Sequence, residues 1–188
     1  PLHTAYVNPL DYLHIDGNSL PYQLQISGLP DVSRVENQIK LELRVSPPVK
    51  QCMIHLPTDC IARHKFYLEK DVSAYPQEFQ DQLLFAEAFL LCSSNDKNTY
   101  VCTRCVKREH RRASRRKSGL SDNMLWCNNE NRRAIIFNNK QVFVAKGSDG
   151  DSTQGDKTFE LTARVVCYCR HHKLSLIHIS EPTRHAQI

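Results

Sequence analysis

IKLELRV, residues Ile39–Val45, places an aliphatic side chain at every second position and a charged side chain between each pair. This period of two is typical of a β-strand that buries one face and exposes the other. The Ser46-Pro47-Pro48 tripeptide ends the strand, because proline offers no N–H to a central ladder. The stretch Phe159–Val165 repeats the pattern, with Phe, Leu, Ala and Val at alternate positions. Two half-buried strands are therefore predicted.

Shorter patterns predict further strands. Leu24 and Ile26 alternate with polar residues, and the apolar runs Ala134–Phe137 and Gln141–Val144 flank Asn138-Asn139 as in a hairpin. Many short strands separated by turn residues are typical of an all-β fold in which two sheets pack face to face. We therefore predict an antiparallel β-sandwich.

One segment leaves its secondary structure open. Gln77–Leu91 fits either a helix that begins after Pro76 or a buried strand over Leu83–Cys92. The turn-rich residues Ser93–Asn98 follow it and favour a hairpin. We expect the strand.

The chain divides into three predicted parts. Its 188 residues, 40% of them hydrophobic, suffice for one domain with a real core. Residues 1–21 are expected to form an extended arm, and residues 22–173 the β-sandwich domain. Leu174–Arg184, LSLIHISEPTR, reads like a translated sequencing adapter, so we expect 174–188 to be a foreign tail and the natural chain to continue beyond Lys173. No apolar run approaches the roughly 18 residues of a membrane span, so no membrane contact is expected from this part.

The positive charge is concentrated in one segment, Cys102–Ser118, CTRCVKREHRRASRRKS. Its eight basic residues and single acid, Glu109, give +7, which leaves −2 for the rest of a chain whose net charge is +5. A nearly neutral body with one intense basic segment indicates a surface for a polyanion. The basic residues are Arg104, Lys107, Arg108, Arg111, Arg112, Arg115, Arg116 and Lys117.

The conformation and role of this basic segment have competing interpretations. As a helix it would place Arg108, Arg112 and Arg116 on one face, but it has no apolar stripe and repels itself, so we expect a loop. Phosphates would relieve the repulsion, and arginine can also read guanine in a major groove. The alternatives are a nuclear-import signal alone or a solvated loop. Ser114 and Ser118 follow basic residues as in kinase substrates, and a phosphate on Ser114 would weaken binding to DNA.

The eight cysteines admit three interpretations. Cys102 and Cys105 form a CxxC pair, and Cys167 and Cys169 form a CxC pair just before two adjacent histidines. Zinc bound by these thiolates, with His171 or His172 as fourth ligand, is one interpretation, and disulfides are another. Reduced core cysteines are the commoner outcome in an intracellular domain, so we predict neither metal nor cofactor.

The sequence gives little support to catalysis or to binding of single-stranded RNA. No GxSxG, HExxH, P-loop or GxGxxG motif occurs. Single-strand readers stack bases on exposed aromatic rings, and the basic segment contains none. We therefore expect a protein that is not an enzyme and whose partner is double-stranded DNA.

Four segments together resemble a known family. They are SRVENQIKLELRV (Ser33–Val45), CTRCVKREHRRASRRKSG (Cys102–Gly119), RRAIIFNNKQVFV (Arg132–Val144) and FELTARVVCYCRHHK (Phe159–Lys173). They are similar to the DNA-binding domain of fungal membrane-tethered transcription activators, which contain an IPT domain and ankyrin repeats and regulate fatty-acid desaturase expression. The resemblance covers Leu24–Lys173.

The resemblance implies a Rel-like, immunoglobulin-type sandwich whose basic loop contacts DNA in a sequence-specific way. It implies that arginines of the basic loop make this contact, and we expect the eight basic residues of the segment to form the contact surface. Arg170 and Lys173, which leave the last predicted strand, are expected to assist at the domain junction. It also implies action in the nucleus after release of a precursor from the endoplasmic reticulum membrane. Whether a homodimer binds is left open, and the alternative function is a protein-interaction sandwich whose basic loop is only an import signal.

Overall fold

The computed structural model describes residues 22–31, 33–34, 36–62, 68–92, 100–115, 132–146, 157–167 and 177–179. The predicted arm 1–21 and the turn 93–98 lie outside these ranges. Within them, no helix is both long and apolar enough to cross a membrane.

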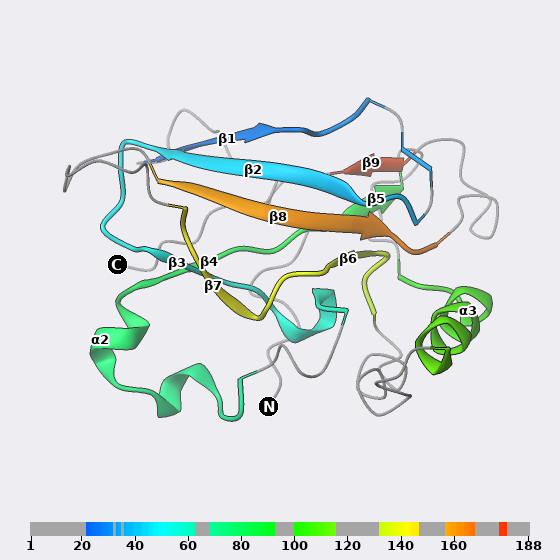
Figure 1. Cartoon of the computed structure of the whole chain (residues 1–188). Helices are drawn as coiled ribbons and strands as arrows, with labels where there is room; N and C mark the ends of the chain where they lie inside the picture. The colour runs from blue at the N-terminus through cyan, green and yellow to red at the C-terminus, as the bar shows by residue number, and fades with distance from the viewer. Residues whose placement is uncertain are drawn as a thin grey trace.

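The first sheet contains the two strands with the clearest sequence pattern (Figure 1). Its order is β1 (Gln23–Ser27), β2 (Ile39–Ser46), β8 (Thr158–Val165) and β6 (Ile135–Phe137), and every neighbouring pair is antiparallel. Leu41 lies opposite Leu161 in the central pair. The aliphatic residues of β2 at 39, 41 and 43 are buried and the charged residues between them are exposed, so the predicted period of two is confirmed.

The second sheet lies across one face of the first (Figure 1). Its order is β4 (Leu83–Phe85), β3 (Met53–His55) and β7 (Val142–Val144), with β3 antiparallel to β7 and parallel to β4. The two sheets form the predicted all-β sandwich, and β3–β4 is a parallel pair within it. The connection between β3 and β4 contains short helical turns: η2 (Thr58–Cys60), η4 (Val72–Ala74) and α2 (Gln77–Gln80).

Two local predictions need correction. The hairpin predicted over 134–144 is wrong, because β6 belongs to the first sheet and β7 to the second. The Asn139 side chain bonds to the backbone of Glu160 and Thr162 on β8, which fixes the crossing. The strand predicted over Leu83–Cys92 is also wrong as one strand: after the single turn of α2 it divides into β4 and β5 (Leu90–Cys92).

β5 forms a separate two-stranded sheet with β9 (Ile177–Ile179), in antiparallel register. The residues of β9 belong to the segment 174–188, which is predicted to be a foreign tail. Strand addition uses backbone N–H and C=O groups, which every sequence has, so the pairing does not test where the tail comes from.

The core fills the space between the two sheets. Phe159, Leu56, Ile61, Ile135 and Val166 are each at most 1% exposed. Burying an aliphatic or aromatic side chain of this size contributes about 1.5–3 kcal/mol. This interior is the main source of stability, and it positions the ends of β6 and β8.

A buried ion cluster lies beside this core. Arg133 donates from Nε to Asp59 Oδ2 and from Nη2 to Glu87 Oε2, both at 2.8 Å. Its guanidinium also lies 4.1 Å from the centre of the Phe89 ring. Burial raises the pKa of Asp59 to about 6, although the positive charge of Arg133 opposes the shift. The cluster joins Arg133, two residues before β6, to Asp59 in the connection between β3 and β4 and to Glu87 just after β4.

Candidate nucleic-acid interface

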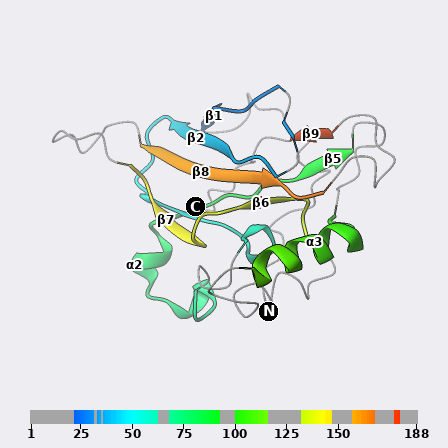
Figure 2. The ribbon, with the colours of Figure 1, turned by 45° about the vertical axis from the view of Figure 1, so that its right-hand side comes forward.

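The basic segment is a helix, α3 (Thr103–Ser114), and the loop prediction is wrong. The helix lies at one end of the sandwich, opposite the end that carries α2 (Figure 2). The carbonyl of Cys102 accepts hydrogen bonds from the backbone N–H groups of Cys105 and Val106, at 2.9 and 3.0 Å, and so begins the helix. Tertiary contacts on one face replace the missing apolar stripe.

The inner face of α3 is held by Cys105 and Glu109, four residues apart and 0% and 2% exposed. Both carboxylate oxygens of Glu109 accept hydrogen bonds from Arg164 of β8, with N–O distances of 2.7 and 2.6 Å. This is the fork-to-fork geometry in which arginine binds a carboxylate most strongly. The single acid of the basic segment is therefore the residue that attaches the helix to the sheet.

Two arginines on the flank of α3 are also used within the molecule. Arg112 Nη1 lies 2.6 Å from Glu36 Oε2, and Arg108 Nε forms an ion pair with the other oxygen of Glu36. Arg108 Nη2 donates to the carbonyl oxygen of Val166 at 2.6 Å. Glu36 is held in place because its N–H donates to the Val165 carbonyl at 2.8 Å. Glu36 thus neutralises one of these two positive charges.

Four other cations form a row along the exposed side of α3 and the residue that follows it, which we call the outer stripe: Arg104, Lys107, Arg111 and Arg115. Their spacing of three, four and four residues keeps them on one side of a helix with 3.6 residues per turn. All four side chains are exposed, and within the described ranges none of them has an ion-pair partner. From the first to the last, the stripe runs about 17 Å along the helix axis.

The structure therefore divides the predicted site residues into groups. Four form the outer stripe, and Arg108 and Arg112 lie on the flank with Glu36. Arg116, Lys117, Arg170 and Lys173 lie outside the described residues. The sequence prediction missed the anchoring residues, although Glu109 had a signal as the only acid of the segment, four residues after Cys105. Glu36 and Arg164 had no such signal, because they are distant in sequence.

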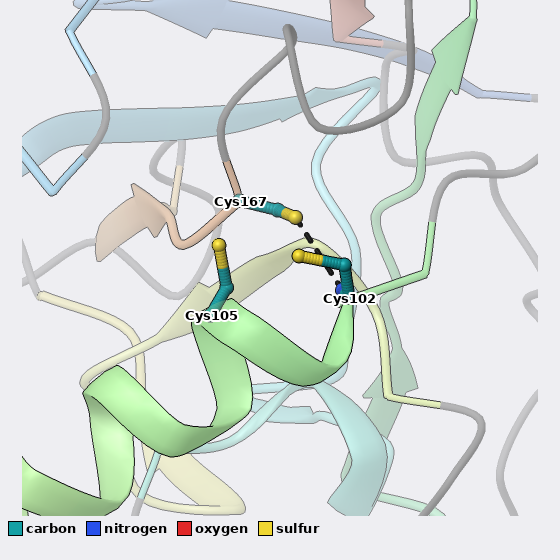
Figure 3. Close-up of side chains that lie close together, drawn as sticks. All are labelled: Cys102, Cys105 and Cys167. Carbon is teal, nitrogen blue, oxygen red and sulfur yellow. Dashed lines mark hydrogen bonds between the residues drawn. The ribbon is translucent and has the colours of Figure 1, made fainter.

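Three thiols meet where α3 begins. Figure 3 shows Cys102, the residue before α3, and Cys105 of its first turn converging with Cys167, which follows β8. Their sulfur atoms all lie within 4.8 Å of one another, and the Cys102 N–H donates to Cys167 Sγ at 3.4 Å. Burial raises the pKa of Cys167. Burial also opposes ionisation of Cys102, but hydrogen bonds from the Cys105 backbone and from the other two thiols outweigh it, and its pKa is lowered.

A β-sandwich that attaches one helix face to its sheet and presents a row of exposed cations on another has the form of a nucleic-acid-binding domain. Residues 21–176 match the family model described as the SPT23/MGA2 DNA-binding domain. The chain belongs to this family, as its resemblance predicted. The family is one of DNA-binding domains and not a class of enzymes.

Two relatives from Saccharomyces cerevisiae (strain ATCC 204508 / S288c) are similar over most of the chain. Protein MGA2 is 53% identical over 175 residues, which is 92% of this chain and 15% of MGA2. Protein SPT23 is 50% identical over 184 residues, which is 92% of this chain and 17% of SPT23. The chain thus spans about a sixth of the length of these relatives. No solved structure matches it.

Proposed function

We propose that this domain binds double-stranded DNA in a sequence-specific way through the outer stripe of α3, as part of a transcription activator that acts in the nucleus. The observation that carries the proposal is a row of four exposed cations, without ion-pair partners among the described residues, on a helix whose other face is fixed. Each phosphate that such a cation neutralises releases counterion, which favours binding.

The width of the major groove, about 12 Å, admits an α-helix. When a helix lies in the groove, the middle of its outer face points to the bases and its ends approach the walls. We therefore assign Lys107 and Arg111 to base edges, and Arg104 and Arg115 to phosphates. Arg111 is the stronger candidate for base recognition, because its guanidinium can donate two parallel hydrogen bonds to guanine O6 and N7.

The anchoring of α3 supports this assignment. The bidentate contact between Glu109 and Arg164, at 2.6 and 2.7 Å, holds the helix before DNA arrives. A helix that is already formed and oriented loses less conformational entropy on binding. In this proposal Arg108 and Arg112 orient the helix, while Arg116 and Lys117, next in the sequence, extend the basic surface.

The wider role follows the family resemblance. The proposal includes control of lipid-desaturation genes and release of a precursor anchored at the endoplasmic reticulum membrane. Both are proposed for a full-length protein of the family, and the chain itself spans 15–17% of the length of its two relatives. The domain folds as a Rel-like sandwich in this proposal, and binding by a homodimer is tested below by stoichiometry.

The test compares two triple variants that remove the same charge. One changes Lys107, Arg111 and Arg115 of the outer stripe to Ala. The control changes Lys50, Lys70 and Lys140 to Ala, three exposed lysines that lie outside α3. Affinity for a labelled duplex is measured by fluorescence anisotropy from low to high salt, and sedimentation of the complex gives the number of chains per duplex.

We expect the wild-type logarithm of affinity to fall with the logarithm of salt with a slope of roughly −3 to −5, as for four to six phosphate contacts. The outer-stripe variant should lose most of its affinity and reduce the slope by about 2 to 3, and the control should keep both. If the folded outer-stripe variant binds like the control, the proposal fails and the basic segment is better explained as an import signal.

A further inference from the structure

The three thiols at the start of α3 are the strongest group of potential ligands that the DNA-binding proposal does not use. Cys102 directly precedes α3, Cys105 lies in its first turn, and Cys167 follows β8, 62 residues after Cys105. We propose that these three cysteines bind a structural zinc ion that joins the first turn of α3 to the end of β8. This inference replaces our expectation of reduced core cysteines, and it does not depend on the proposed DNA contact.

The distances suit a metal with tetrahedral coordination. All three sulfur atoms lie within 4.8 Å of one another. Zinc–sulfur bonds of about 2.3 Å in tetrahedral geometry require sulfur–sulfur distances of about 3.8 Å. Small rotations of the side chains would bring the sulfur atoms from their present separation to the distance that zinc requires, because all three already point toward one another (Figure 3).

The surroundings favour thiolate ligands in several ways. Cys105 and Cys167 are 0% and 1% exposed, so the site excludes most water. The Cys102 N–H donates to Cys167 Sγ at 3.4 Å, which is the kind of second contact that orients a metal ligand. Three thiolates around one Zn²⁺ carry a net negative charge, and the positive end of the α3 dipole lies beside them.

Arg108 adds a further positive charge close to the site. Its Nη2 atom lies 2.6 Å from the carbonyl oxygen of Val166, the residue before Cys167. A full cation near the metal-bound thiolates compensates their excess negative charge. Arg108 therefore contacts both the backbone beside the proposed metal site and the carboxylate of Glu36.

A disulfide explains the arrangement less well. It would join two of the three sulfur atoms and leave the third unpaired in the same small space. Cys52, Cys60, Cys102, Cys105 and Cys167 are not in disulfides, and Cys52 and Cys60 lie apart from the group of three. A metal uses all three sulfur atoms at once and also explains why a CxxC pair begins the helix.

Zinc would add coordination bonds to the hydrogen bonds and ion pairs that already hold α3. Glu109 holds the middle of the helix to β8 through Arg164, and the metal would hold its start to Cys167, two residues after β8. Coordination at the start of a helix restrains its tilt more strongly than hydrogen bonds alone. The site would therefore set the orientation of the outer stripe.

The experiment measures the metal directly. The 188-residue chain is purified under reducing conditions, saturated with Zn²⁺ and desalted, and its zinc content is determined by mass spectrometry of the element. The variants are Cys102→Ser, Cys105→Ser and Cys167→Ser, with Cys52→Ser as the matched control. Circular dichroism establishes that each variant is folded. Replacing zinc by Co²⁺ gives a second measurement, because thiolate-bound Co²⁺ has a charge-transfer absorption in the near ultraviolet.

We expect about one zinc per chain in the wild type and in Cys52→Ser, with thiolate-to-cobalt absorption in both. Loss of zinc from folded Cys102→Ser, the most exposed of the three positions, supports the site even where the buried variants fail to fold. A wild type that keeps no zinc, or zinc that survives all three changes, overturns the proposal, as does a disulfide between any two of the three cysteines. Zinc content is measured without DNA, so failure here leaves the proposed function untouched.

Discussion

The two sides of α3 use the same residue types for different tasks. On the inner side Glu109 binds Arg164, and on the flank Glu36 binds Arg108 and Arg112. On the outer side Arg104, Lys107, Arg111 and Arg115 have no ion-pair partner within the described ranges. The number of basic residues in a segment is therefore not the number of contacts available to DNA, because some of the charges hold the helix in place.

We expect the greatest loss of stability when the ion pair between Glu109 and Arg164 is broken. Changing Glu109 to Gln leaves the Arg164 guanidinium buried with a weaker partner. Removal of one partner from a buried ion pair costs about 3–5 kcal/mol, so we expect a large loss of unfolding free energy in urea.

A double variant separates the charge from the packing. Glu109→Met combined with Arg164→Met removes both charges, and we expect it to recover part of the stability lost by Glu109→Gln. If both variants are as stable as the wild type, Glu109 does not anchor the helix.

The second buried ion cluster, Arg133 with Asp59 and Glu87, differs from the Glu109–Arg164 pair in how its stability depends on pH. There two carboxylates share one guanidinium, whereas Glu109 binds Arg164 through both of its oxygens and also lies 3.8 Å from Arg112 Nη1. The pKa of Asp59 is raised from 3.8 to about 6 by burial, so the folded protein holds this proton more tightly than the unfolded chain. The contribution of this proton to the free energy of unfolding is therefore complete below pH 3.8 and is lost as the pH rises through 6.

We therefore expect the unfolding free energy to contain a component that falls by on the order of 2 kcal/mol between about pH 4 and 6. Asp59→Asn cannot titrate and should lack this component, while its DNA affinity at pH 7 stays that of the wild type. An identical pH dependence in Asp59→Asn and the wild type would contradict the prediction.

Two adjacent arginines test the division within α3 itself. Arg111 belongs to the outer stripe, and Arg112 pairs with Glu36. We expect Arg111→Ala to weaken binding to the cognate duplex by about 1–3 kcal/mol, or roughly 5- to 150-fold, without a change in stability.

Arg112→Ala is the matched control, since it removes the same side chain one position away. It should lower the unfolding free energy slightly and change DNA affinity less than Arg111→Ala does. Equal losses of affinity in the two variants would show that α3 has no separate inner and outer sides for DNA.

Glu36→Gln should change stability less than Glu109→Gln does. The change removes the negative charge that pairs with Arg108 and Arg112, both of which are partly exposed. We expect a loss of stability below about 1 kcal/mol, as for other partly exposed ion pairs. Non-specific DNA affinity at low salt should rise, with a steeper salt dependence. Unchanged or weaker binding would indicate that the two arginines do not face the DNA even when released.

The period of two in Ile39–Val45 and Phe159–Val165 was enough to predict the central strands and the sandwich. It worked because a half-buried strand repeats its environment at every second residue, which the sequence records directly. The hairpin over 134–144 was wrong, because a turn signal at Asn138-Asn139 marks a change of direction but not which sheet the next strand joins.

The helical state of the basic segment could not be predicted for a related reason. Helix patterns are sought as stripes of apolar residues, and the inner side of α3 is built around Cys105 and Glu109. Glu109 becomes a core residue only because Arg164, 55 positions further on, neutralises it.

The sequence by itself determined the strand pattern, the location of the charge and membership of a DNA-binding family, because each depends on residue types that are close together in the chain. Tertiary structure alone decided which cations remain exposed and which sulfur atoms meet. Those outcomes depend on Glu36, Arg164 and Cys167, which are far from α3 in sequence and reach it only when the sandwich closes.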